Sequence, residues 1–146
     1  MLKMQLSSIP EGNSHQEYEW IMKDSEAFEK DGEISIHAIF EVNNIHCRQY
    51  EVKGVLAYNI HFDCDRCNSP FNKEFKEPVR FILKKDYLGD DMDIISFNDN
   101  QVDLTDYLRD IIIVSVPIKK LCREDCKGLC PHCGADLNKD KCKCTK

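Results

Sequence analysis

Eight of the nine cysteines in this chain of 146 residues fall into closely spaced pairs. Such a pair can bring two thiolates to one metal ion, because the turn between them leaves backbone N–H groups free to bond the sulfur atoms. Zinc takes four soft or borderline ligands in a tetrahedron, so eight paired thiols suffice for two sites. The paired residues are Cys64, Cys67, Cys122, Cys126, Cys130, Cys133, Cys142 and Cys144.

The last four of these cysteines predict one complete site. Cys130 and Cys133 are separated by two residues, and Gly134 allows a sharp turn after the second ligand. Cys142 and Cys144 return to them after a short loop. We therefore predict a four-thiolate zinc site within residues 130–144.

The remaining four cysteines predict a second site, formed by Cys64 and Cys67 together with Cys122 and Cys126. Two alternatives stay open: the first pair could meet Cys130 and Cys133 instead, or one zinc could be accompanied by spare reduced thiols. Neither set of four has an evident open ligand position, and closed zinc sites are structural. We predict two structural Zn²⁺ ions and no catalytic residue.

Other motifs that would indicate catalysis are absent. The chain has no GxGxxG, no P-loop, no GxSxG and no HExxH. The acidic residues of 86–93 lack the spacing of an EF-hand and predict a solvated loop. We expect that the protein is not an enzyme and has no small-molecule substrate.

The ninth cysteine, Cys47, is predicted to be a small core or strand residue. Solvated side chains are predicted for His37, His46, His61 and His132.

Alternating apolar residues predict the strands that must position the cysteines. Short alternation at 2–6 is followed by clearer patterns at 34–42, 50–62 and 71–83. Asn43-Asn44 is predicted to form a turn, Gly54 a bend, and Pro78 a bulge or an edge position. The last two strands meet at Cys64 and Cys67, so we predict a hairpin with two metal ligands at its tip.

Helical spacing follows Asp103, which is predicted to be the N-cap of a helix that ends by Pro117. Residues 15–30 predict a short helix or an ordered loop, and residues 86–101 a loop. The predicted fold class is α+β, with an antiparallel sheet, for which a barrel-like form is one option, one main helix and a C-terminal zinc-binding lobe. We expect a body at residues 1–121, which includes the Cys64/Cys67 hairpin, and a cysteine-rich lobe at 122–146 packed on it.

No apolar run is long enough to span a membrane, and the first residues lack the apolar segment of a signal peptide. We therefore expect a cytoplasmic protein with no membrane partner. In a reducing cytosol, CxxC pairs are more often metal ligands or redox centres than structural disulfides.

Charge divides the chain into two unequal parts. Residues 1–116 carry 12 Lys/Arg and 22 Asp/Glu, a balance of −10, whereas residues 117–146 carry 8 and 4, a balance of +4. A basic tail can contact an acidic partner such as RNA. The lysines can equally offset the negative charge of zinc-bound thiolates. Both interpretations stay open at this point.

Three motifs in this order resemble the YceD-like large ribosomal RNA subunit accumulation proteins. They are Cys64-Asp-Arg-Cys67-Asn-Ser-Pro-Phe71, Asp103-Leu-Thr-Asp-Tyr-Leu-Arg109, and the run from Val116-Pro117 through Cys122, Cys126, Cys130 and Cys133 to Asn138. The resemblance implies a non-enzymatic role in large-subunit ribosomal RNA accumulation and ribosome assembly. It implies ribosomal RNA or a large-subunit ribosomal protein as the partner. It also favours pairing Cys64 and Cys67 with Cys122 and Cys126, because the first pair is the more general one in the family.

Two other functions fit the same cysteines. Cys142-x-Cys144 beside Cys130-x2-Cys133 is an array that can eject zinc on oxidation, as in a thiol-based redox sensor or a redox-regulated chaperone. A zinc-stabilised protein-interaction module, which binds through a sheet edge or through the cysteine lobe, is the second alternative.

Overall fold

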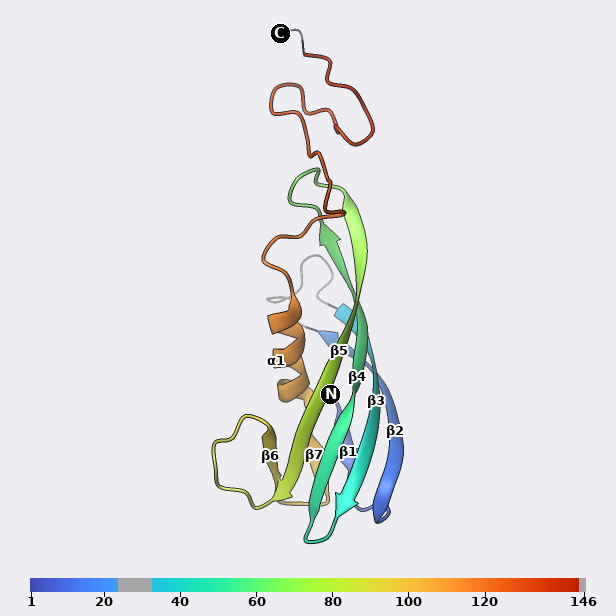
Figure 1. The fold of residues 1–146 in the computed structure, drawn as a ribbon, viewed down its shortest axis with the longest axis vertical. Helices are drawn as coiled ribbons and strands as arrows, with labels where there is room; N and C mark the ends of the chain where they lie inside the picture. Colours follow the sequence, from blue (N-terminus) through green and yellow to red (C-terminus); the bar gives the residue numbers. More distant parts are fainter. Residues whose placement is uncertain (24–32, 145–146) are drawn as a thin grey trace.

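The computed structural model describes residues 1–23 and 33–144. In the described chain seven strands precede a helix (Figure 1). In chain order the elements are β1 (Lys3–Gln5), β2 (Gly12–Lys23), β3 (Glu33–Ile45), β4 (Gln49–Asp63), β5 (Pro70–Lys85), β6 (Ile94–Phe97), β7 (Gln101–Asp103) and α1 (Thr105–Ser115). Strands with a separate helix agree with the predicted α+β class.

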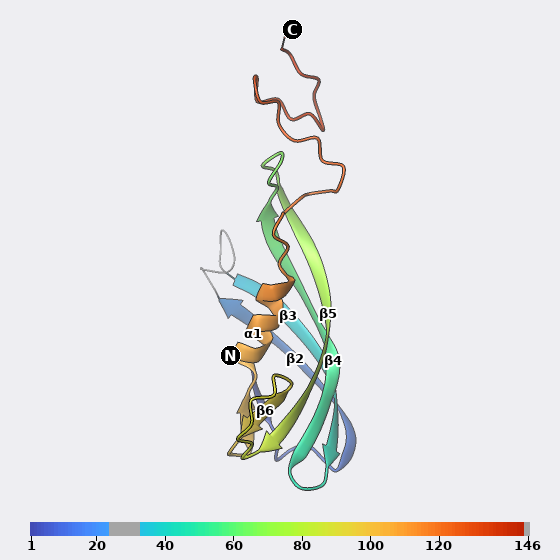
Figure 2. The same cartoon turned by 60° about the vertical axis from the view of Figure 1, so that its left-hand side comes forward.

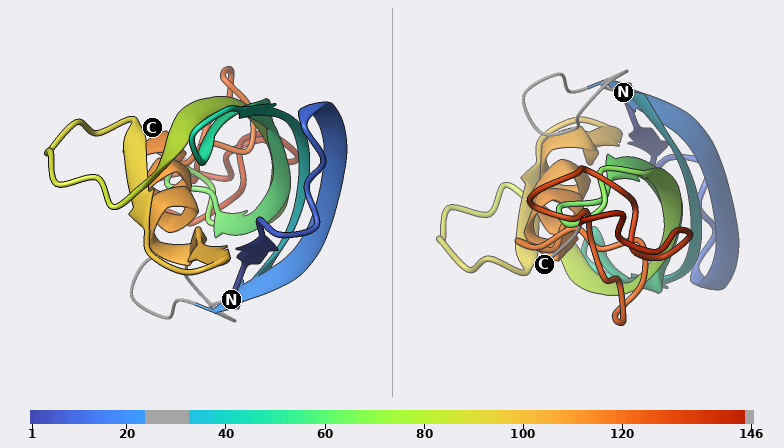
Figure 3. Two further views of the ribbon diagram at one scale, coloured as in Figure 1. Left: turned by 90° about the horizontal axis from the view of Figure 1, so that it is seen from below. Right: turned by 90° about the horizontal axis from the view of Figure 1, so that it is seen from above.

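In the part of the chain that the structure describes, the main sheet has five strands in the order β2-β3-β4-β5-β6, and β1 pairs with β7 in a second, two-stranded sheet. Neighbours from β2 to β5 are antiparallel, whereas β6 runs parallel to β5. Within the described residues β2 and β6 are open edges, so the sheet is not a closed barrel and the barrel-like alternative is wrong. The sheet curls instead around α1 and the β1–β7 pair (Figure 3).

The core lies between the concave face of the main sheet and α1 (Figure 2). Alternate residues of β3, β4 and β5 are buried, which is the period-two pattern of a sheet covered on one face. The helix contributes Leu108 and Ile112, both fully buried. The rings of Phe81 and Tyr107 meet edge to face with centroids 5.1 Å apart. The strands predicted at 34–42, 50–62 and 71–83 lie within β3, β4 and β5.

Gly54 is required by the close approach of β3 to β4. A Cβ atom at this position would lie 2.1 Å from the carbonyl oxygen of Ile39 and 2.6 Å from the Phe40 ring. No side chain fits there without moving the backbone of the neighbouring strand. On β5, Pro78 pairs with Val55 of β4, and β6 joins β5 only from Ile82 onward. Pro78 thus stands where the outer side of β5 lacks a strand within the described chain, in agreement with the predicted edge position.

Three local predictions are wrong. Residues 15–23 belong to β2, which pairs with β3 along its whole length, rather than to a helix or loop; residues 24–30 of that prediction lie outside the described part. The turn falls at 46–48 and not at Asn43-Asn44, which are in β3. Cys47 lies exposed in this turn with a φ of 74°, so it is not a core or strand residue.

The helix begins one residue later than predicted. Leu104 is its N-cap and makes no side-chain capping bond, while Asp103 Oδ1 accepts the N–H of Thr105 at 2.9 Å. Within the predicted loop at 86–101, residues 94–97 form the short strand β6. The helix ends at Ser115, two residues before Pro117. In the described part of the chain, no helix combines the length and the apolar character needed to cross a membrane.

Candidate metal centres

The proximal cluster consists of Cys64, Cys67, Cys122 and Cys126, whose sulfur atoms all lie within 4.8 Å of one another. Cys64 and Cys67 stand in the turn between β4 and β5, and the other two cysteines follow α1 in the chain. The segment after α1 runs back to the tip of the β4–β5 hairpin, as Figure 2 shows. The predicted hairpin with two cysteines at its tip is confirmed.

Backbone hydrogen bonds fix the turn that carries the first two thiols. The N–H of Asn68 donates to the carbonyl of Cys64 at 2.9 Å, and the N–H of Cys64 donates to the carbonyl of Ser69 at 2.9 Å. Asn68 has a φ of 58°, which asparagine tolerates better than most residues. The turn therefore holds both sulfur atoms on the same side, toward the C-terminal segment.

Reciprocal bonds join this turn to the segment after the helix. The N–H of Asp65 donates to the carbonyl of Lys120, and the N–H of Lys120 donates to Asp65 Oδ2, both at 2.7 Å. Arg66 Nη1 donates to the carbonyl of Cys126 at 3.0 Å, and the carbonyl of Arg66 accepts the N–H of Leu129 at 3.1 Å. These bonds help to place Cys122 and Cys126 opposite the hairpin tip.

Hydrogen-bond donors also reach the proximal sulfur atoms. The N–H of Cys122 donates to Cys64 Sγ at 3.3 Å, and Asn138 Nδ2 donates to Cys126 Sγ at 3.3 Å. Burial raises the pKa of Cys64, but backbone N–H groups led by that of Cys122 outweigh this effect and lower the pKa to about 6. Burial and then the neighbouring cysteines raise the pKa of Cys122 to about 12. Burial and hydrogen bonding thus shift the pKa values of two thiols of this cluster in opposite directions.

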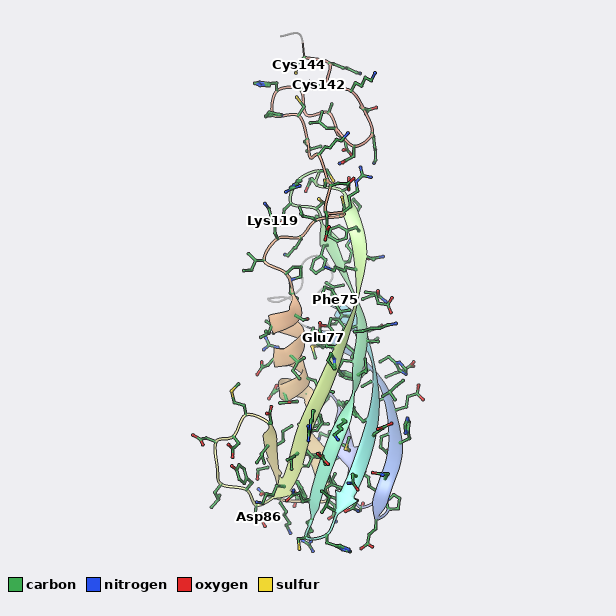
Figure 4. The ribbon with its side chains drawn as sticks, in the orientation of Figure 1. Phe75, Glu77, Asp86, Lys119, Cys142 and Cys144 are labelled. Carbon is green, nitrogen blue, oxygen red and sulfur yellow. The ribbon has the colours of Figure 1, made fainter. Side chains whose placement is uncertain are left out.

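The distal cluster consists of Cys130, Cys133, Cys142 and Cys144, whose sulfur atoms also lie within 4.8 Å of one another. Gly134, with a φ of 72°, donates its N–H to the carbonyl of Cys130 at 2.9 Å, which closes the turn as its sequence predicts. The N–H of Cys144 donates to Cys142 Sγ at 3.3 Å. Figure 4 places Cys142 and Cys144 at the far end of the molecule from the sheet.

The two clusters differ in exposure. Cys64, Cys67 and Cys126 are buried, whereas Cys133, Cys142 and Cys144 are exposed. The backbone N–H groups of Cys133 and His132 lower the pKa of Cys130 to about 6. Hydrogen bonds to Cys142 and Cys133 raise the pKa of Cys144 to about 12. As in the proximal cluster, the pKa of one thiol is lowered and that of another is raised, here in a more exposed cluster.

The spacing of the sulfur atoms fits a tetrahedral zinc ion. A Zn–S bond of ~2.3 Å gives a tetrahedron with S–S edges of about 3.8 Å. In the proximal cluster Cys64 and Cys126 are 3.7 Å apart, as are Cys67 and Cys122. In the distal cluster Cys130 lies 3.3 Å from Cys142 and 3.7 Å from Cys144, and Cys133 lies 3.9 Å from Cys142. All nine cysteines are free thiols, so either group could hold a divalent ion.

The structure brings together the eight cysteines in the grouping of four and four that the ligand count favours, and Cys64 and Cys67 do not meet Cys130 and Cys133. The role of these residues as metal ligands and the boundary between residues 121 and 122 stay predictions. Among the described residues no histidine belongs to either group of four: His46 and His132 have exposed side chains, and His37 and His61 contact Glu17 and Asn72.

Sequence reasoning missed three residues that support the clusters, namely Asp65, Arg66 and Asn138. They lie within the cysteine motifs, where Asp and Asn next to tight turns often accept backbone N–H groups. That signal could have identified Asn138, which accepts the N–H of Lys127 at 2.9 Å. It could not have shown which distant sulfur atom the same side chain reaches.

Comparison with known proteins decides the family. A family model described as "Large ribosomal RNA subunit accumulation protein YceD" matches residues 52–146, a range that contains all eight clustered cysteines. The chain belongs to this family. The resemblance that the cysteine and helix motifs suggested is thereby confirmed. No solved structure matches this chain.

Relatives of this chain include two plant proteins named large ribosomal RNA subunit accumulation protein YCED homolog 1, chloroplastic. The Arabidopsis thaliana protein is 41% identical over 44 residues and the Zea mays protein 40% over 40, which is 30% and 27% of this chain and 14% of each relative. An uncharacterised protein of Mycobacterium bovis is 28% identical over 91 residues, 59% of this chain and 44% of its own length. The matches thus span less than half the length of each of these relatives.

Proposed function

We propose that the chain is a non-enzymatic factor that supports accumulation of large-subunit ribosomal RNA, and with it ribosome assembly, and that two structural Zn²⁺ ions hold its C-terminal part in place. The family match over residues 52–146 carries this proposal. The plant relatives are named after the same process. The matched range holds both cysteine clusters, which ties the role to the part of the chain that they organise.

Zinc at these clusters would act on structure and not on a substrate. Each cluster supplies four thiols, which fill the tetrahedron of the ion and leave no position for water or a substrate. The Asp65–Lys120 and Asn138–Cys126 hydrogen bonds give the proximal cluster the surroundings that orient metal ligands. Zinc would supply the positive charge that four neighbouring thiolates require. We therefore assign no catalytic step to the protein.

The clusters would present a basic segment to an acidic partner. Residues 117–146 have a balance of +4 against −10 for residues 1–116. Lys119 and Lys120 lie three and two residues before Cys122, and Lys139, Lys141 and Lys143 lie among the distal cysteines. Phosphate contacts by such side chains give RNA binding that weakens steeply with salt. We propose ribosomal RNA as the principal partner on this basis.

Depletion of the chain in its own host tests the proposal. Large-subunit ribosomal RNA should fall relative to small-subunit RNA, and an unaltered copy should restore it. A copy with Cys64→Ser should restore it poorly, whereas Cys47→Ser, which changes the exposed turn cysteine, should restore it fully. An unchanged ratio of the two RNAs after depletion would refute the function.

A second candidate function, a protein-interaction module, is favoured by a groove beside α1. The groove has a volume of about 560 Å³ and is lined by the apolar side chains of Met92, Ile111 and Val114, with Glu77 and Asp110 among its polar residues. The side chains of Met92 and Val114 are 90% and 84% exposed. If this function holds, Val114→Ser should abolish capture of a protein partner in the presence of nuclease. Capture that nuclease alone abolishes would favour the RNA function instead.

A further inference from the structure

A cavity of about 390 Å³ lies between the β4–β5 hairpin and the segment that follows α1. Two aromatic rings line it, those of Phe62 and Phe71, with centroids 5.7 Å apart. Lys73 of β5 and Lys119 of the segment after α1 contribute cations from its two sides. Its volume is within the range of sites that hold small organic molecules.

Positive charge dominates this cavity although the body of the protein is acidic. Lys120 Nζ lies 5.5 Å from the centroid of the Phe62 ring, and Arg123 also lines the cavity. Glu124 is the one carboxylate in its lining among the described residues. Lys73 and Lys119 are exposed, and neither forms an ion pair within the part of the chain that the structure describes. Figure 4 labels Lys119 on the segment between α1 and the cysteines.

Aromatic rings beside lysines are a combination that can bind a nucleotide. A base can pack against a ring, while the ammonium groups meet the phosphates that flank it. Phe71 is half-buried and lines the cavity, so part of its ring is accessible, whereas its cross-strand neighbour Phe62 is buried. Bases in a duplex have no free face to offer, so a concave site of this kind favours an unpaired strand.

We infer that this cavity binds an unpaired nucleotide of an RNA strand, with the base against Phe71 and the adjacent phosphates beside Lys73 and Lys119. The inference rests on the proposed function for the choice of RNA among polyanions. Cys122 also lines the cavity, and the Asp65–Lys120 bonds hold the same wall. The proximal cluster therefore positions half of the site, so a bound metal and RNA affinity are coupled.

Fluorescence anisotropy of the full, zinc-loaded chain tests the inference, with a labelled unstructured oligoribonucleotide as the probe. The single strand should bind at least about 10-fold more tightly than the same strand in a duplex. Lys73→Gln and Lys119→Gln should each weaken binding about 3- to 10-fold and reduce the salt slope by about 0.7. Phe71→Leu, which keeps an apolar side chain, should weaken binding about 10-fold with little change in that slope.

Lys76→Gln is the matched control, because Lys76 lies on β5 with its side chain exposed and outside the cavity. Metal content and circular dichroism of each variant exclude misfolding as the cause. Equal affinity of Lys76→Gln, Lys73→Gln and Phe71→Leu would overturn the inference. Equal affinity for the single strand and the duplex would also overturn it. Competition by polyglutamate that depends on the same residues would overturn it too, because it would indicate an acidic protein ligand. RNA binding that follows these residues in a protein whose depletion leaves ribosomal RNA unchanged would support the cavity and refute the proposed function.

Discussion

The Sγ atoms of Cys64 and Cys126 lie 3.7 Å apart although 62 positions separate the two residues in the chain. A metal ion between them would close a long loop that contains β5, β6, β7 and α1. Such a link stabilises a fold by restricting the unfolded chain. It also fixes the basic segment after α1 against the tip of the β4–β5 hairpin, which relates the cysteine chemistry to the proposed RNA site.

Replacing Asn138 should weaken metal binding at the proximal cluster, even though this residue lies in the loop of the distal cluster. Its Nδ2 donates to Cys126 Sγ at 3.3 Å, and its Oδ1 accepts the N–H of Lys127. Loss of such a supporting bond lowers metal affinity by roughly 10- to 100-fold. Chelator competition on Asn138→Ala should show this decrease, with Lys139→Ala as the control. Equal metal affinity of the two variants would contradict the assigned role.

The reciprocal pairing of Asp65 with Lys120 should hold the segment after α1 in place. Asp65→Ala removes the acceptor of the Lys120 N–H and should lower the free energy of unfolding by about 1–2 kcal/mol. It should also speed tryptic cleavage after Lys119 and Lys120, because the segment opens more often. Asp90→Ala, in the exposed acidic loop, should change neither quantity. An unaltered cleavage rate in Asp65→Ala would show that the bond is dispensable.

Gly54→Ala should destabilise the sheet strongly. The added methyl group would meet the carbonyl oxygen of Ile39 at 2.1 Å, and the backbone of β3 would have to move. We expect the free energy of unfolding, measured with urea, to fall by about 3 kcal/mol. Lys53 is an exposed neighbour of Gly54 on β4. The free energy of unfolding of Lys53→Ala should lie within ~0.5 kcal/mol of that of the unaltered chain. A loss in Gly54→Ala as small as in this control would mean that the strands are not so closely packed.

Mild oxidation should release metal from the distal cluster before the proximal one. Cys133, Cys142 and Cys144 are exposed, whereas Cys64, Cys67 and Cys126 are buried, and thiolate oxidation follows exposure. Treatment with peroxide, followed by alkylation and mass spectrometry, should find the distal cysteines modified first. Simultaneous modification of both groups would show that burial does not protect the proximal cluster. Reversible release of the metal, coupled to a gain of chaperone activity, would favour the alternative of a redox-regulated protein.

The strands that carry the proximal cluster were predictable because one face of each is covered by the core. Along β4, residues such as Val52, Leu56 and Ile60 are buried on one side, and this burial requires apolar alternation. The inward face of β2 includes Ser14 and Gln16, which are half-buried at the sheet edge. Polar side chains at these positions hide the period of two, so the strand was mistaken for a helix or loop.

The cysteine grouping was only partly predictable. The spacing indicated which thiols share a turn. Cys64 and Cys67 could still have met Cys122 and Cys126 or Cys130 and Cys133, because no local signal specifies the path of the chain after α1. The bonds of Asp65 and Arg66 to that segment depend on this path. The exposure of Cys47 was not predictable for a similar reason. It follows from a turn at 46–48, whereas the sequence indicated a turn at the asparagines 43 and 44.

Metal content per chain, measured by mass spectrometry under native conditions, tests the central claim most directly. The chain purified without chelator should carry two zinc ions, because two separate groups of four thiols fit the ion. Cys64→Ser and Cys130→Ser should each retain one, since each change removes a ligand from a different cluster. One ion or none in the unaltered chain, or loss of both ions in either variant, would contradict the assignment of two independent structural sites.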